Sequence, residues 1–120
     1  MIHIKKIMAP VDFSETSKKA VNYALSLALE FDAKLILAHI APYDVKVFEE
    51  SKAQLLELIP PAYRERIDFE IVVKSGSVRP EIIEIVNERE ADLVVMGTHG
   101  RPYFERLLLG SVTERMLRKL

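Results

Sequence analysis

The hydrophobic and polar residues follow two different periods along the chain. Nearly unbroken apolar runs predict strands within residues 5–13, 34–40, 67–76 and 92–97. Runs of this kind are typical of strands covered on both faces, as in parallel sheets. The sequence therefore predicts four buried strands.

Between these runs, apolar residues return every three or four positions, which is the spacing of one helical face. Helices are predicted after Ser14, over residues 44–59, from Pro80, and from Gly110-Ser111. Pro60 and Pro61 end the second helix or mark a sharp break in it. The residues expected on the buried faces of the first two helices are Val21, Ala24, Leu25, Ala28, Phe31, Val45, Phe48, Leu55, Leu56 and Ile59.

Strands that alternate with helices favour an α/β fold, an open parallel sheet of Rossmann-like type with helices on both faces. In such folds ligands bind at the carboxyl ends of the strands. Asp12 follows the first predicted strand, His39 and Ile40 end the second, and Gly97 ends the fourth. These residues are therefore expected at one edge of the sheet.

Composition narrows the class of protein. With 120 residues, of which 49% are hydrophobic and 29% charged, the chain is expected to form a single soluble domain over residues 1–120. The net charge of −1 gives no general attraction to nucleic acid or to an anionic membrane. The absence of cysteine excludes disulfides, and the start "MIHIKKIMAP" has no long apolar segment. We expect a cytoplasmic protein.

Three of the four glycines lie between residues 97 and 110. Gly97 and Gly100 flank a turn after a strand, where glycine can take a positive φ and lets a ligand approach the backbone. Gly110-Ser111 begins a helix, whose free N–H groups and dipole favour a phosphate. Together these features predict a phosphate site. The alternative is that the first two glycines only make the turn and that Ser111 only caps the helix.

These residues carry a resemblance to a known family. Gly97-Thr98-His99-Gly100, then "RPYFERLLL", then Gly110-Ser111, resembles the nucleotide pattern of the ATP-binding branch of the universal stress proteins. The pattern is glycine, two residues, glycine, nine residues, glycine and a serine or threonine. "PVDFSE" in the first strand also resembles the family's entry motif, and the likeness spans the chain.

The resemblance implies a nucleotide site with named residues. It implies that Asp12 approaches the ribose or adenine and that the backbone of Ile40 reads the adenine. It also implies ATP as the ligand, with Mg²⁺ arriving with the phosphates. The residues that it implies around the ribose and phosphates are Gly97, His99, Gly100, Gly110, Ser111, Val112 and Thr113.

One departure from the family concerns assembly. Relatives usually continue into a fifth strand, whereas this sequence ends with "TERMLRKL", so we expect the sheet to lack that strand. Either the sequence given omits a natural tail, or the fourth strand becomes an exposed apolar edge that would pair with another chain. We expect a homodimer formed through a contact different from the family's usual strand pairing.

Three classes of function are consistent with these features. The first is a nucleotide-dependent regulatory protein of the stress response, acting on an unidentified protein partner. The second is an ATPase or transferase, which is at most slow because the sequence has no Walker lysine and no evident base beside an attacking water. The third is a ligand-free interaction module. His3, His39 and His99 lack metal-ligand spacing, so no metal site is expected among them.

Overall fold

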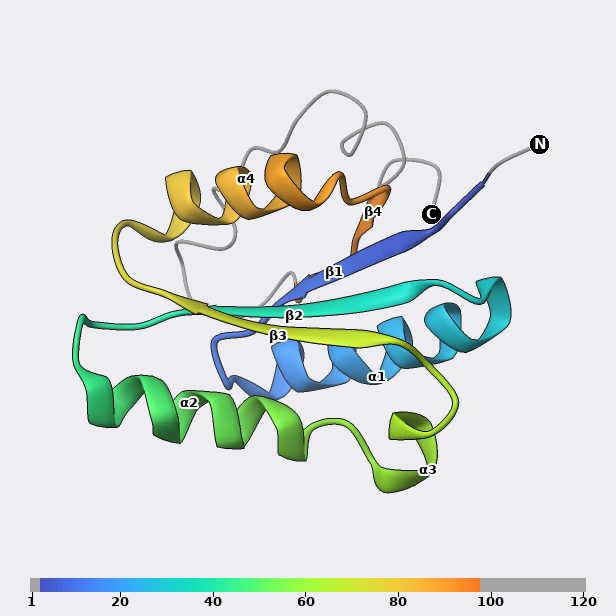
Figure 1. Cartoon of the computed structure of the whole chain (residues 1–120), viewed down its shortest axis with the longest axis horizontal. Coiled ribbons are helices and arrows are strands. Elements are labelled where there is room, and N and C mark those ends of the chain that lie inside the picture. The colour runs from blue at the N-terminus through green and yellow to red at the C-terminus, as the bar shows by residue number, and fades with distance from the viewer. Residues whose placement is uncertain (1–2, 98–120) are drawn as a thin grey trace.

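The computed structural model describes residues 3–97, and these form an open parallel sheet (Figure 1). Its strands are β1 (Lys6–Pro10), β2 (Lys34–Ile40), β3 (Phe69–Lys74) and β4 (Leu93–Val94). They lie side by side in the order β3-β2-β1-β4, and every pair is parallel. The predicted α/β fold with an open sheet is confirmed.

Helices cover both faces of this sheet (Figure 1). Helices α1 (Glu15–Phe31) and α2 (Val45–Glu57) lie on one face, and α4 (Val78–Arg89) lies on the other. A short helix, α3 (Pro61–Arg64), follows the predicted break at the two prolines. The helix predicted from Gly110-Ser111 lies outside the described residues.

The period-two pattern of the strands divides the core into two layers. Ile7, Leu35 and Leu37 pack with α1 and α2, whereas Met8 and Ile36 pack with α4. All five side chains are fully buried. The sheet thus needs both helical layers, which explains why its strands read as continuous apolar runs.

Side chains define where the helices begin. Ser14 caps α1 by accepting a hydrogen bond from the N–H of Ser17, and Asp44 caps α2 by accepting from the N–H groups of Lys46 and Val47. Helix α4 begins at Val78, two residues before the predicted start at Pro80. Proline fits this first turn because its missing N–H has no helical partner there.

Three sequence predictions need correction. Phe31 and Val45 were expected on buried faces, yet 42% and 77% of their surfaces are exposed. Phe31 is the last residue of α1 and Val45 the first of α2, so both lie at helix ends that extend past the core. The strand predicted over residues 92–97 is shorter, since β4 pairs with β1 only through Leu93 and Val94.

Candidate functional site

The carboxyl ends of β1 and β4 mark the point where the strand order reverses. The chain leaves β1 through α1 toward β2, whereas β3 leads through α4 back across the sheet to β4 on the far side of β1. Such a reversal opens the crevice in which α/β proteins bind ligands. Asp12 follows β1, Gly97 follows β4, and Ile40 ends the neighbouring β2. All three lie at this edge of the sheet.

Asp12 shapes the turn between β1 and α1. Its side chain is buried, and Oδ1 accepts hydrogen bonds from the backbone N–H of Ser14, at 2.9 Å, and from the Ser14 hydroxyl. Ser14 Oγ in turn accepts from Ser17 N–H at 3.2 Å. Between them, Phe13 takes a left-handed conformation with φ of 63°. Asp12 therefore holds both the turn and the start of α1.

Gly97 is required for a close contact with α1. A Cβ at this position would stand 2.8 Å from the backbone carbonyl carbon of Thr16, closer than real Cβ atoms approach other atoms. Gly97 does not use the positive φ that glycine allows, because Gly76, at 125°, is the described glycine with a positive φ. The missing side chain instead lets the segment that follows β4 approach the first turn of α1. The close approach of a ligand to Gly97 stays a prediction.

A small hollow lies between the ends of β1 and β2. Its volume is about 10 Å³, close to the space of one water molecule. The hollow is lined by Val11, Asp12, Ala38, His39, Ile40, Val78 and Ile82. Asp12 and Ile40, which the sequence predicted as ligand contacts, therefore share one hollow.

His39, which the sequence also places at this edge but to which no ligand contact was assigned, lines the same hollow. Its Nδ1 lies 2.6 Å from the carbonyl oxygen of Val11, and its ring centroid lies 4.7 Å from that of Phe13. A carbonyl oxygen can only accept, so Nδ1 donates this hydrogen bond. The signal available in the sequence was the position of His39 at the end of a buried strand, beside Ile40.

The remaining predicted site residues lie outside the described part of the chain. They are His99, Gly100, Gly110, Ser111, Val112 and Thr113. Within residues 3–97, no three His, Asp or Glu side chains are grouped so that they could hold a metal ion. Over the same residues, no helix combines the length and the apolar character needed to cross a membrane.

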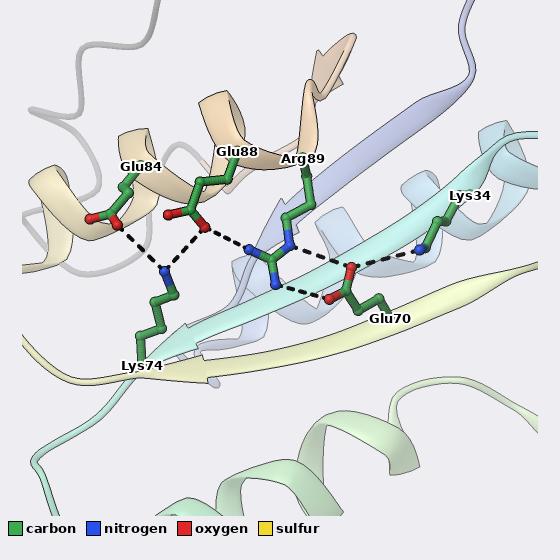
Figure 2. Close-up of polar contacts among 6 residues, drawn as sticks. All are labelled: Lys34, Glu70, Lys74, Glu84, Glu88 and Arg89. Atoms are coloured by element: carbon green, nitrogen blue, oxygen red, sulfur yellow. Dashed lines mark hydrogen bonds and ion pairs between the residues drawn. The ribbon is translucent and has the colours of Figure 1, made fainter.

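A network of ion pairs ties α4 to the sheet on the face opposite α1 (Figure 2). Arg89 donates to both carboxylate oxygens of Glu70, with distances of 2.9 and 3.4 Å, and Lys34 lies 3.7 Å from the same carboxylate. The hydrogen bond from Arg89 lowers the pKa of Glu70 and raises the pKa of Arg89. This pair joins β3 to the last turn of α4.

The network continues toward the carboxyl end of β3. Lys74 lies 3.8 Å from Glu84 and 3.4 Å from Glu88, and Glu88 also pairs with Arg89 at 2.9 Å (Figure 2). A hydrogen bond between the two carboxyl groups raises the pKa of Glu84 and lowers that of Glu88. These ion pairs join the carboxyl end of β3 to α4 and add to the contacts that hold the helix against the sheet.

The described residues form an open α/β fold with a parallel sheet, and sequence comparison identifies the family. Residues 3–120 match the model of the universal stress protein family. The chain belongs to this family.

Named relatives come from an archaeon and a bacterium. Universal stress protein MJ0531 of Methanocaldococcus jannaschii is 32% identical, over 95% of this chain and 76% of that protein. Putative universal stress protein SAUSA300_1656 of Staphylococcus aureus is also 32% identical, over 98% of this chain and 80% of that protein. The likeness therefore covers nearly all of this chain.

Solved structures share the fold. The structure of MJ0577 from M. jannaschii has a TM-score of 0.74 and 26% identity, covering 98% of this chain and 91% of that chain. A universal stress protein in complex with cAMP has a TM-score of 0.68 and 27% identity, covering 98% and 90%. An Arabidopsis thaliana family member with AMP bound is 21% identical, with a TM-score of 0.61, and supports the fold alone.

Proposed function

We propose that this protein binds ATP at the carboxyl edge of the sheet and acts as a nucleotide-dependent regulatory protein of the stress response. The observation that carries the proposal is that Asp12, Ile40 and Gly97 lie at the carboxyl ends of adjacent strands, where the strand order reverses. The cAMP complex of a 27% identical relative supports a nucleotide as the ligand.

Each residue has a part in this proposal. Asp12 accepts hydrogen bonds from the ribose or adenine, and the backbone of Ile40 pairs with the adenine edge. Gly97, His99, Gly100, Gly110, Ser111, Val112 and Thr113 surround the ribose and phosphates. Free N–H groups at a helix start after Gly110 would suit the phosphate charge.

Mg²⁺ fits this site as a companion of the phosphates. Magnesium prefers oxygen ligands and keeps several waters, so one or two protein oxygens are sufficient. No cluster of acidic or histidine side chains for a metal occurs in residues 3–97. The phosphates of ATP would therefore supply the oxygen ligands that hold the ion.

We further propose that the chain acts as one domain and as a cytoplasmic homodimer, and that it responds to ATP by changing how it binds a protein partner. The support for self-association is that β4 lies at the edge of the sheet formed by the described residues. Light scattering of the purified chain tests it, with a dimer expected and a monomer at high concentration contradicting it.

Mass analysis of the nucleotide released from natively purified protein tests the proposed ligand. We expect ATP, or its hydrolysis product ADP, in a defined ratio to protein. An extract without nucleotide, together with no saturable binding of added ATP, would instead assign the chain to ligand-free interaction modules. Turnover with Mg²⁺ is expected to be far below the enzyme median of about 10 per second.

A further inference from the structure

The ladder between β1 and β2 stops just before the end of β2. Lys34 N–H donates to Lys5 O at the start of this ladder, and Val11 N–H donates to Ala38 O at its end, each at 2.8 Å. N–H groups of a parallel strand point alternately to its two neighbours. Ala41 N–H donates to Lys74 on β3, also at 2.8 Å. The N–H of Ile40, one residue earlier, is therefore directed toward β1.

The acceptor that would continue the ladder is the carbonyl oxygen of Val11. In the regular register, Ile40 N–H would donate to it, since Lys34 donates to Lys5 and each further rung advances two residues on both strands. The Val11 oxygen instead accepts from Nδ1 of His39 at 2.6 Å. A side chain thus occupies the position of the next rung.

The imidazole is held in this position by its surroundings. Its ring packs at 56° against the ring of Phe13, whose left-handed backbone turns the chain away from β2. His39, Ile40 and Asp12 all line the same hollow. The chain leaves β1 for α1 here, and His39 donates to Val11 O. The ladder between β1 and β2 therefore ends at the site where the nucleotide is proposed to bind.

We propose that His39 is a positioning residue for nucleotide recognition: by donating to Val11 O, it keeps the N–H of Ile40 out of the sheet ladder and available to a purine. This inference rests on the proposed function. Adenine presents an acceptor at N1, which an available backbone N–H can pair with, whereas guanine presents a donor there. His39 would therefore determine base selectivity without touching the base.

Two substitutions of similar shape separate this role from simple packing. His39→Asn places an amide N–H close to the position of Nδ1, so it keeps a donor for Val11 O. His39→Leu has nearly the same size and shape as the asparagine variant but has no donor. The two variants therefore differ mainly in whether residue 39 can donate a hydrogen bond to Val11 O.

Amide hydrogen exchange of the full chain without nucleotide is the first measurement. In His39→Leu, Val11 O becomes available and Ile40 N–H takes the rung, so its exchange should slow by about tenfold relative to the wild type. In His39→Asn, exchange at Ile40 should stay within about twofold of the wild type. Equal exchange at Ile40 in all three proteins would overturn the inference.

Binding of ATP and GTP is the second measurement. His39→Leu should weaken ATP binding about tenfold and reduce the preference for ATP over GTP by a similar factor, while His39→Asn keeps both. If both variants lose the same affinity with selectivity unchanged, His39 is a packing residue and the inference is wrong. If the wild type binds no ATP, the proposed function fails, and the exchange measurement still decides whether His39 controls Ile40.

Discussion

Gly97 lies directly against the backbone of Thr16 at the carboxyl end of the sheet. A Cβ on Gly97 would stand 2.8 Å from the carbonyl carbon and 3.0 Å from the carbonyl oxygen of Thr16. The first turn of α1, which follows Asp12, therefore lies against the segment that follows β4. The contact thus places Gly97 beside the helix start that follows Asp12.

Gly97→Ala should lower the free energy of unfolding by about 1–3 kcal/mol, because backbone atoms of Thr16 must move to admit the methyl group. Urea denaturation followed by circular dichroism measures this change. The control is Thr16→Ala combined with Gly97→Ala. Since the closest contact is with the Thr16 backbone, the double variant should be no more stable than Gly97→Ala. Alanine keeps the Cβ of Thr16, so full recovery of stability would mean that the Thr16 hydroxyl or methyl group causes the clash.

Asp12→Ala should destabilise the protein by about 1–3 kcal/mol, since it removes the acceptor for two groups of Ser14. Asp12→Asn keeps an oxygen in that place and should cost less than half as much. Thermal unfolding of the two variants compares them. Equal losses would mean that the negative charge, and not the acceptor position, stabilises the turn.

Glu70→Gln should reduce stability at neutral pH by about 0.5–1 kcal/mol, the range expected for a partly exposed ion pair. The hydrogen bond from Arg89 lowers the pKa of Glu70 in the folded protein. Its stabilising effect is therefore complete above the unfolded pKa of about 4.3 and is lost as the pH falls through the lower folded pKa.

The measurement is urea unfolding of Glu70→Gln and the wild type from about pH 7 to about pH 3, across the ordinary pKa of glutamate. The difference in unfolding free energy should shrink toward zero on acidification. Glu30→Gln, at an exposed position of α1, is the matched control and should show a smaller effect. A constant difference at all pH values would contradict a charge-based role for Glu70.

Much of this fold could be predicted from the sequence because its strands are buried on both faces. The continuous apolar run over residues 34–40 gave β2 its observed bounds, and Ser14 marked the start of α1. Phe31 and Val45 could not be placed correctly, because periodicity does not show where a helix extends past the core. The length of β4 depends on its pairing with β1, which a local pattern does not contain.

The candidate site was predictable in position but less so in its contacts. Asp12, Ile40 and Gly97 could be placed at one edge of the sheet because each lies at the carboxyl end of a predicted strand and parallel strands end at the same edge. The positive φ expected at Gly97 was wrong, and its contact with Thr16 could not be predicted because the two residues lie far apart in the sequence. The hydrogen bond from His39 to Val11 O could not be predicted either, because it depends on the register between β1 and β2.

Competition of a labelled ATP analogue by ATP and by GTP, with Mg²⁺ present, tests the central claim most directly. If the Ile40 backbone reads adenine, guanine leaves two polar groups mispaired at about 1–3 kcal/mol each, so GTP should compete at least roughly 30-fold more weakly than ATP. Gly110→Val should abolish binding of the analogue while the circular dichroism spectrum stays unchanged. Absence of saturable binding to the wild type, or equal inhibition constants for ATP and GTP, would contradict the account.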